Sequence, residues 1–179
     1  FYNITNCINN NVPVISGTTG WLDDYNKVVA LCNEKNGAFI YASNYSLGVN
    51  IFFELNKTLA KMMSTLEQYN VSMEEIHHTQ KLDAPSGTAI SLANDIISQS
   101  KKYDAWELDG DTNNKIPIVA KRIEDVPGTH TVNYNSEVDS ITIEHIAHNR
   151  QGFALGAVIA AEWIVGKTGV FTMNDVLGL

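Results

Sequence analysis

Residues 12–20 read VPVISGTTG, a short β-prone run that ends in a loop rich in glycine and threonine. A strand that runs into such a loop is typical of the parallel sheets of α/β proteins. Apolar residues at three- and four-residue intervals then predict a helix from Leu22 to Cys32, with the turn Asn36-Gly37 as its stop. A second β-prone run, Ala38–Ala42, follows. This order predicts two parallel strands whose carboxyl ends carry ligand-binding loops.

The remainder of the chain predicts a second lobe of different construction. Helical spacing runs through Val49–Leu66 and Pro85–Ser100, and a last helix, Phe153–Val165, precedes a short tail. Strand patterns occur at Val71–His78, Ile116–Ala120, Thr129–Tyr134 and Ser140–Ala147. The predicted fold is therefore α/β: a partial Rossmann-type lobe plus an α+β lobe with a mixed sheet of about four strands and helices on one face. The predicted boundaries are 1–46 for the first lobe, 47–149 for the second, and 150–179 for a helix and tail that return to the first.

Composition excludes several classes of function. The 12 Lys and Arg face 20 Asp and Glu, a net charge of −8, which is the wrong sign for a nucleic-acid binder. No apolar run reaches the roughly 18 residues that a membrane span needs, so no membrane partner is expected. Cys7 and Cys32 lack metal or redox spacing, which favours a reducing, cytoplasmic location.

The residues best suited to chemistry lie in the stretch 75–89, EIHHTQKLDAPSGTA. If His77 and His78 end a strand, their rings point to opposite faces and serve different purposes rather than one metal. The helix start after Pro85, with Ser86, Gly87 and Thr88, offers free N–H groups and hydroxyls to an anion, and Lys81 adds a cation nearby. The alternative is that the hydroxyls are ordinary caps and the histidines merely packed or exposed. A proton donor, a cation and an anion site together suit the reduction of an anionic, unsaturated substrate.

This stretch resembles the signature of the 4-hydroxy-tetrahydrodipicolinate reductase (dihydrodipicolinate reductase) family, which serves the diaminopimelate route to lysine. Five other segments resemble the family in the same order and extend the likeness over nearly the whole chain: Gly17–Gly20, Asn44–Asn50, Val126–His130, Arg150–Ala157 and Phe171–Leu177.

The resemblance implies a homotetramer that reduces a cyclic imine dicarboxylate by hydride transfer from NADH or NADPH. It implies that His77 is the general acid and Lys81 its cationic partner. The implied substrate-binding residues are His78, Gly87 and Thr88. The implied cofactor-binding residues, which line the nicotinamide and its ribose, are Gly17, Thr18, Thr19, Ala42, Ser43, Asn44, Tyr45 and Arg150.

Three departures from the family pattern bear on this expectation. Tyr45 stands where many relatives have Phe, which keeps the ring. Ile123-Glu124 replaces the small residue and Gly that often follow the arginine before Val-Pro-Gly. The family's opening strand and glycine-rich phosphate loop have no counterpart in these residues, so we expect weak dinucleotide binding and no indication of the preference between NADH and NADPH.

Two alternative functions remain open from the sequence. One is a truncated, non-catalytic fragment that binds a dicarboxylate or serves assembly; the other is a related reductase for a different keto or imino acid. No metal site is expected, because the calcium-loop-like run from Asp109 has Asn114 and Ala120 at two key positions. His130, His145 and His148 likewise lack zinc-type companions. Gly152 and Gly156 predict close helix packing.

Overall fold

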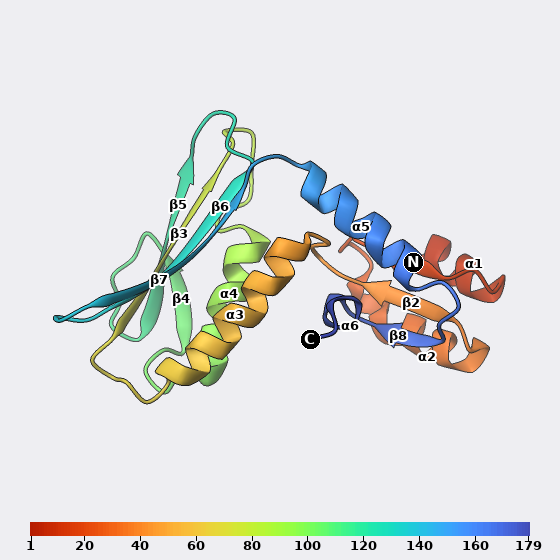
Figure 1. Ribbon diagram of the computed structural model, residues 1–179, viewed down its shortest axis with the longest axis horizontal. Helices are drawn as coiled ribbons and strands as arrows, with labels where there is room; N and C mark the ends of the chain where they lie inside the picture. The colour runs from red at the N-terminus through yellow and green to blue at the C-terminus, as the bar shows by residue number, and fades with distance from the viewer. The chain divides into compact units, whose positions relative to one another are not determined.

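The computed structural model describes residues 1–179 and divides them into two compact units, 1–50 with 151–179 and 51–150 (Figure 1). Helix α3 (Leu47–Met63) begins in the first unit and lies mostly in the second. No helix has both the length and the apolar character needed to cross a membrane.

The first unit is built on a three-stranded parallel sheet in the order β1-β2-β8. Its strands are β1 (Val14–Ser16), β2 (Ala38–Tyr41) and β8 (Gly169–Phe171), with β2 between the other two. The parallel pairing of the first two strands confirms the prediction. Strand β8 was missed and assigned to the tail, because a strand of three half-buried residues that begins with a glycine is too short to show periodicity.

Helices bury both faces of this small sheet. They are α1 (Tyr2–Asn9), α2 (Tyr25–Lys35, after a 3-10 turn at Leu22–Asp24), α5 (Gln151–Trp163) and α6 (Met173–Leu177). Phe39 packs among residues of α1 and α2, whereas its neighbour Ile40 packs among residues of α5 and α6, because successive side chains of a strand alternate. A Cβ at position 156 would overlap the carbonyl oxygen of Tyr45, so the predicted close packing is confirmed at Gly156.

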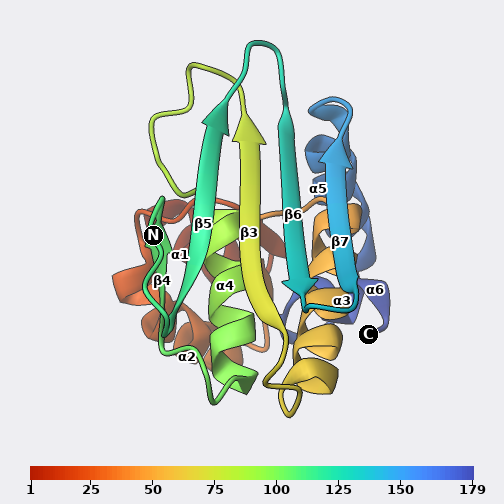
Figure 2. The same ribbon diagram turned by 90° about the vertical axis from the view of Figure 1, so that its left-hand side faces the viewer.

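The second unit contains a mixed sheet of five strands in the order β4-β5-β3-β6-β7 (Figure 2). The strands are β3 (Asn70–His77), β4 (Ala105–Leu108), β5 (Lys115–Arg122), β6 (Gly128–Asn135) and β7 (Ser140–Ala147). Strands β4, β5 and β3 pair in parallel, whereas β6 pairs antiparallel with both of its neighbours, β3 and β7. The mixed sheet is confirmed, but the predicted count of about four is corrected to five. Edge strand β4 was missed because its four residues show no alternation of burial.

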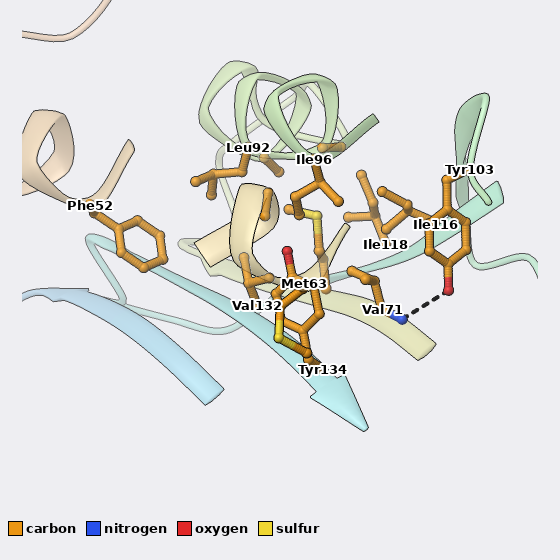
Figure 3. Packing of buried hydrophobic residues seen from close by; sticks show 14 residues of the cluster. Phe52, Met63, Val71, Leu92, Ile96, Tyr103, Ile116, Ile118, Val132 and Tyr134 are labelled. Atoms are coloured by element: carbon orange, nitrogen blue, oxygen red, sulfur yellow. Dashed lines mark hydrogen bonds between the residues drawn. The ribbon is translucent and has the colours of Figure 1, made fainter. Parts of the chain in front are cut away.

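Two helices, α3 and α4 (Gly87–Gln99), cover one face of this sheet (Figure 2). Their inner faces meet the strands in a core that includes Phe52, Leu92, Ile116 and Val132 (Figure 3). Buried Asn56 of α3 donates its side-chain amide to the carbonyl of Leu92 at 3.0 Å, which ties α3 to α4. Helix α4 is therefore held in the second unit by packing against the sheet as well as by a hydrogen bond from α3.

Candidate active site

Strand β3 places two of its polar side chains inside the second unit. Burial alternates along the strand, so Met73, Glu75 and His77 face inward. Glu75 is 0% exposed and His77 is 8% exposed. His78 lies just beyond the strand and is half-buried, so the alternation of burial continues to it, in agreement with the expectation that the two histidine rings point to opposite faces.

The carboxylate of Glu75 has partners on three different segments. Its Oε2 accepts a hydrogen bond from the backbone nitrogen of Ser86 at 3.0 Å, and its Oε1 accepts one from Nη2 of Arg122 at 3.0 Å. Nδ1 of His77 lies 3.3 Å from Oε2, within ion-pair distance but not aligned as a hydrogen bond. Burial by itself would raise the pKa of Glu75, but His77, Ser86 and Arg122 outweigh it and lower the pKa to about 2. Glu75 is therefore ionised at neutral pH.

His130 of β6 packs beside His77, with ring centroids 5.0 Å apart in an edge-to-face arrangement. Its Nε2 lies 2.9 Å from the hydroxyl oxygen of Ser86. Burial and the neighbouring His77 lower the pKa of His130 to about 3, although Glu75 acts in the opposite direction. His130 is therefore a neutral hydrogen-bonding partner at physiological pH.

The start of α4 only partly matches the predicted anion site. Ser86 is buried, and its hydroxyl caps the helix by accepting a hydrogen bond from the backbone nitrogen of Ala89 at 3.2 Å. The prediction that its hydroxyl faces outward is wrong, because capping turns it inward. Gly87 is exposed and Thr88 half-buried, and a Cβ at Gly87 would meet nothing within 4 Å. The first turn at these two residues is thus open to an anion.

Lys81 lies in the loop between His77 and α4 and is held there by a neighbour. Its Nζ lies 2.8 and 2.9 Å from the two carboxylate oxygens of Asp83. Hydrogen bonding from Lys81 lowers the pKa of Asp83. The carbonyl of Asp83 also accepts a hydrogen bond from Nη2 of Arg122 at 2.7 Å. In the structure Lys81 pairs with Asp83, so its expected partnership with His77 remains a prediction.

The residues expected to bind the cofactor lie mostly on two loops of the first unit. Gly17, Thr18 and Thr19 follow β1, and Ala42, Ser43, Asn44 and Tyr45 follow β2. Because β1 and β2 are parallel neighbours, both loops leave the same edge of the sheet. Thr18, Thr19 and Ser43 are exposed. Arg150 is also exposed but belongs to the second unit.

Tyr45 has a structural role in the first of these units. Its ring is 7% exposed, and its hydroxyl donates to the carbonyl of Ser16 at 3.0 Å, with the carbonyl of Ile40 at 3.3 Å. Burial raises the pKa of Tyr45 to about 12. A Cβ at Gly17 would lie 3.4 Å from the Tyr45 ring, so the ring forms the floor of the Gly17 loop.

Comparison with known proteins decides the family. A model described as dihydrodipicolinate reductase, C-terminus, matches residues 48–177. The 4-hydroxy-tetrahydrodipicolinate reductase of Christiangramia forsetii is 62% identical over 177 residues, which cover 99% of this chain and 74% of the relative. The chain belongs to the dihydrodipicolinate reductase family.

More distant relatives of the family agree. The 4-hydroxy-tetrahydrodipicolinate reductase of Methanoregula boonei is 36% identical over 181 residues, which cover 99% of this chain and 70% of that protein. A solved structure, a dipicolinate-bound dihydrodipicolinate reductase from Paenisporosarcina sp. TG-14, matches with a TM-score of 0.74 at 24% identity. That match covers 96% of this chain and 66% of the solved chain, and it shows a shared fold.

Sequence reasoning missed the two charged residues that hold the site of this reductase-family chain together. Glu75 stands two residues before His77, the spacing that puts both side chains on one face of a strand, so a usable signal was present. Arg122 gave no such signal, because its partnership with Glu75 joins residues far apart in sequence. His130 was weighed as a metal ligand against strand packing and surface exposure, and it was assigned no role in the site.

Glu75, His77 and His130 also bring potential metal-ligating atoms within 4.8 Å of one another. The carboxylate of Glu75 already accepts hydrogen bonds from Ser86 and from the guanidinium of Arg122. A cation placed there would face the Arg122 charge directly, so we interpret the group as a hydrogen-bonded network. A cavity of about 340 Å³ lies elsewhere in the unit between residues such as Met63, Tyr103 and Tyr134, and none of the predicted site residues lines it.

Proposed function

We propose that this chain carries the dicarboxylate-binding and proton-donating site of a 4-hydroxy-tetrahydrodipicolinate reductase. Such an enzyme uses NADH or NADPH to form tetrahydrodipicolinate in the diaminopimelate pathway of lysine biosynthesis. The observation that carries the proposal is the placement of His77 beside the ionised carboxylate of Glu75, with the open first turn of α4 anchored to the same carboxylate. Family membership supplies the substrate class.

The first turn of α4 is the proposed seat for a substrate carboxylate. The free N–H groups at Gly87 and Thr88 lie at the positive end of a 13-residue helix. The absence of a side chain at Gly87 lets the ligand approach the backbone. His78 and Lys81, in the adjoining loop, complete the proposed environment for a dianion.

His77 is the proposed general acid. When bound, the reduced nicotinamide supplies a hydride to the substrate ring. The electron pair displaced by that addition needs a proton, and a histidine beside an anion is suited to deliver it. The 4-hydroxyl group of the substrate leaves as water before the hydride adds. His77 would be reprotonated from solvent after the proton transfer, so that each turnover consumes one hydride and one proton and releases one water.

Gly17, Thr18, Thr19, Ala42, Ser43, Asn44 and Arg150 are the proposed contacts of the nicotinamide and its ribose. The open loop at Gly17 fits this assignment, because a Cβ there would fill the space over the Tyr45 ring. Tyr45 would support the Gly17 loop with its ring, since its hydroxyl is already bonded to backbone carbonyls. These residues would contact only the nicotinamide and its ribose, not the rest of the dinucleotide.

A homotetramer in the cytoplasm is the proposed state of the protein. The outer face of the five-stranded sheet, opposite α3 and α4, carries the exposed apolar side chains of Val119 and Ile146 among polar neighbours. A sheet face of this kind can pair with a second copy. Sedimentation of the full chain tests the assembly directly.

Two assays test the proposed function. Titration calorimetry with pyridine-2,6-dicarboxylate is expected to show saturable binding that Thr88→Val weakens, and lack of binding contradicts the proposal. Oxidation of NADH or NADPH with the cyclic substrate, strongly slowed by His77→Ala, supports reductase activity of the chain. Binding without oxidation favours the non-catalytic fragment, and oxidation only with another keto or imino acid favours the third alternative.

A further inference from the structure

We propose that Glu75 is the positioning residue of this site, and that Arg122 extends its effect to the Lys81 loop. The inference rests on the proposed function, in which His77 donates the proton and the start of α4 binds a carboxylate. It adds two residues to which the sequence pattern assigned no role. Neither needs to touch the substrate.

The burial of Glu75 calls for an explanation. A carboxylate that is 0% exposed loses its hydration and is retained only where protein donors replace the water. Buried ion pairs are weak contributors to stability, because their desolvation offsets their attraction. The partners of Glu75 therefore matter more as a clue to its function than as a source of folding energy.

Each partner belongs to a separate part of the proposed machinery. Oε2 faces Nδ1 of His77 at 3.3 Å and accepts the backbone N–H of Ser86 at 3.0 Å. The first contact restrains the ring of the proposed acid, and the second fixes the residue that caps α4. One oxygen atom thus sets the spacing between the proton donor and the anion-binding turn.

Arg122 links the carboxylate of Glu75 to the loop that contains Lys81. Its Nη2 donates both to Oε1 of Glu75 at 3.0 Å and to the carbonyl of Asp83 at 2.7 Å. The carboxylate of Asp83 in turn pairs with Nζ of Lys81 at 2.8 Å. Removing the charge of Glu75 would free Arg122 and with it the segment that presents Lys81.

The orientation of His77 follows from the same arrangement. A proton on Nδ1 faces the Glu75 carboxylate, so the neutral ring left after proton transfer keeps Nδ1–H, and the acid form carries the proton to be donated on Nε2. Nε2 lies on the side of Gly128, where a Cβ would come within 3.2 Å. The absence of a side chain at Gly128 therefore leaves Nε2 as the nitrogen with room to meet a substrate.

The variant Glu75→Gln tests the proposal, and Glu74→Gln is its matched control. Glu74 precedes Glu75 in β3 and lies on the opposite face of the sheet. Its Oε2 pairs with Nζ of Lys121 at 2.5 Å. The first readout is the ring ¹⁵N NMR spectrum of His77. We expect the Nδ1–H form to dominate in the wild type and in the control variant, and to give way to a mixture in Glu75→Gln.

The second readout is the affinity for pyridine-2,6-dicarboxylate, measured by calorimetry. We expect Glu75→Gln to weaken it about tenfold, Glu75→Asp to restore part of the loss, and Glu74→Gln to leave it unchanged. If Glu75→Gln does not fold, Arg122→Lys, which keeps the positive charge but breaks the shared contact with Asp83, is expected to weaken the affinity in the same direction.

A folded Glu75→Gln variant with the wild-type His77 spectrum and wild-type affinity would overturn the proposal, as would unchanged affinity in Arg122→Lys. Failure of the wild type to bind the dicarboxylate would instead contradict the proposed function. The NMR readout on His77 would still decide the positioning role in that case, because it needs no ligand.

Discussion

Ser86 donates its backbone N–H to Oε2 of Glu75 across 3.0 Å, and this contact joins the cap of α4 to the strand that carries His77. The two residues are eleven positions apart and enclose the loop that contains Lys81. The loop is therefore closed at its base by a charge-assisted hydrogen bond to an ionised, buried carboxylate. Its ends are restrained, while Leu82 in its middle is 98% exposed.

Removal of the proposed acid should separate turnover from binding. In His77→Ala we expect kcat to fall by about 10²–10⁴, the usual contribution of a general acid, while the affinity for pyridine-2,6-dicarboxylate changes much less. His148→Ala, which alters an exposed histidine beyond β7, serves as the control. Unchanged kcat in the first variant would remove His77 from its role.

Gly128→Ala should crowd the proton-donating nitrogen of His77 while removing none of the ionisable side chains of the site. The new Cβ would lie 3.2 Å from Nε2 of His77, closer than ordinary packing allows, so the ring must shift. We expect lower turnover in steady-state kinetics and also a lower midpoint of thermal unfolding, because Gly128 has a φ of +158°, a backbone conformation that alanine rarely adopts. Gly20→Ala, where a Cβ meets nothing within 4 Å, should leave turnover unaffected. Equal turnover in both variants would show that Nε2 needs no open space.

Acid should destabilise the second unit through His130. Its folded pKa of about 3 lies below the ordinary value of 6.5, so the unfolded chain binds the extra proton as the pH falls between these values. Stability is then lost on acidification, by up to about 1.4 kcal/mol per pH unit. Glu75, with a folded pKa of about 2 against 4.5, adds a loss of the same sign below pH 4.5.

Urea unfolding at a series of pH values measures this dependence. His130→Gln should flatten the slope between pH 6.5 and 3, whereas His148→Gln, at an exposed position, should leave it unchanged. An identical slope in His130→Gln and the wild type would show that His130 is not held neutral by burial.

Tyr45→Phe should affect stability and spare dicarboxylate binding. The substitution removes a buried hydroxyl that donates to the carbonyl of Ser16, at an expected cost of about 1 kcal/mol in the free energy of unfolding. Tyr2→Phe, at a side chain that is 84% exposed, is the control for denaturant unfolding. A loss of dicarboxylate affinity in Tyr45→Phe would contradict the purely structural role of the hydroxyl.

Local patterns in the sequence predicted most of the fold. The strand–loop–helix–strand order near the N-terminus and the alternation in β3, β6 and β7 carry their own periodicity, and the parallel pairing of β1 with β2 followed from it. Strands β4 and β8 were missed because they are only four and three residues long. Such short strands are defined by their neighbours rather than by their own sequence.

The site was predictable to a lesser degree, for a related reason. The motif around His77 and Gly87 is contiguous, so it could be found by inspection. The contact between Glu75 and Arg122 joins residues 47 positions apart, and it exists only because β3 and β5 pair in parallel. The inward turn of Ser86 likewise depends on the packing of α4 against the sheet.

The most direct test of the account is a titration of the isotopically labelled chain with pyridine-2,6-dicarboxylate, followed through its backbone amide NMR signals. We expect saturable shifts that are largest at Gly87 and Thr88, with smaller ones at His77, His78 and Lys81. Saturable shifts confined to another region, such as the cavity between Met63 and Tyr134, or no shifts at all, would contradict it.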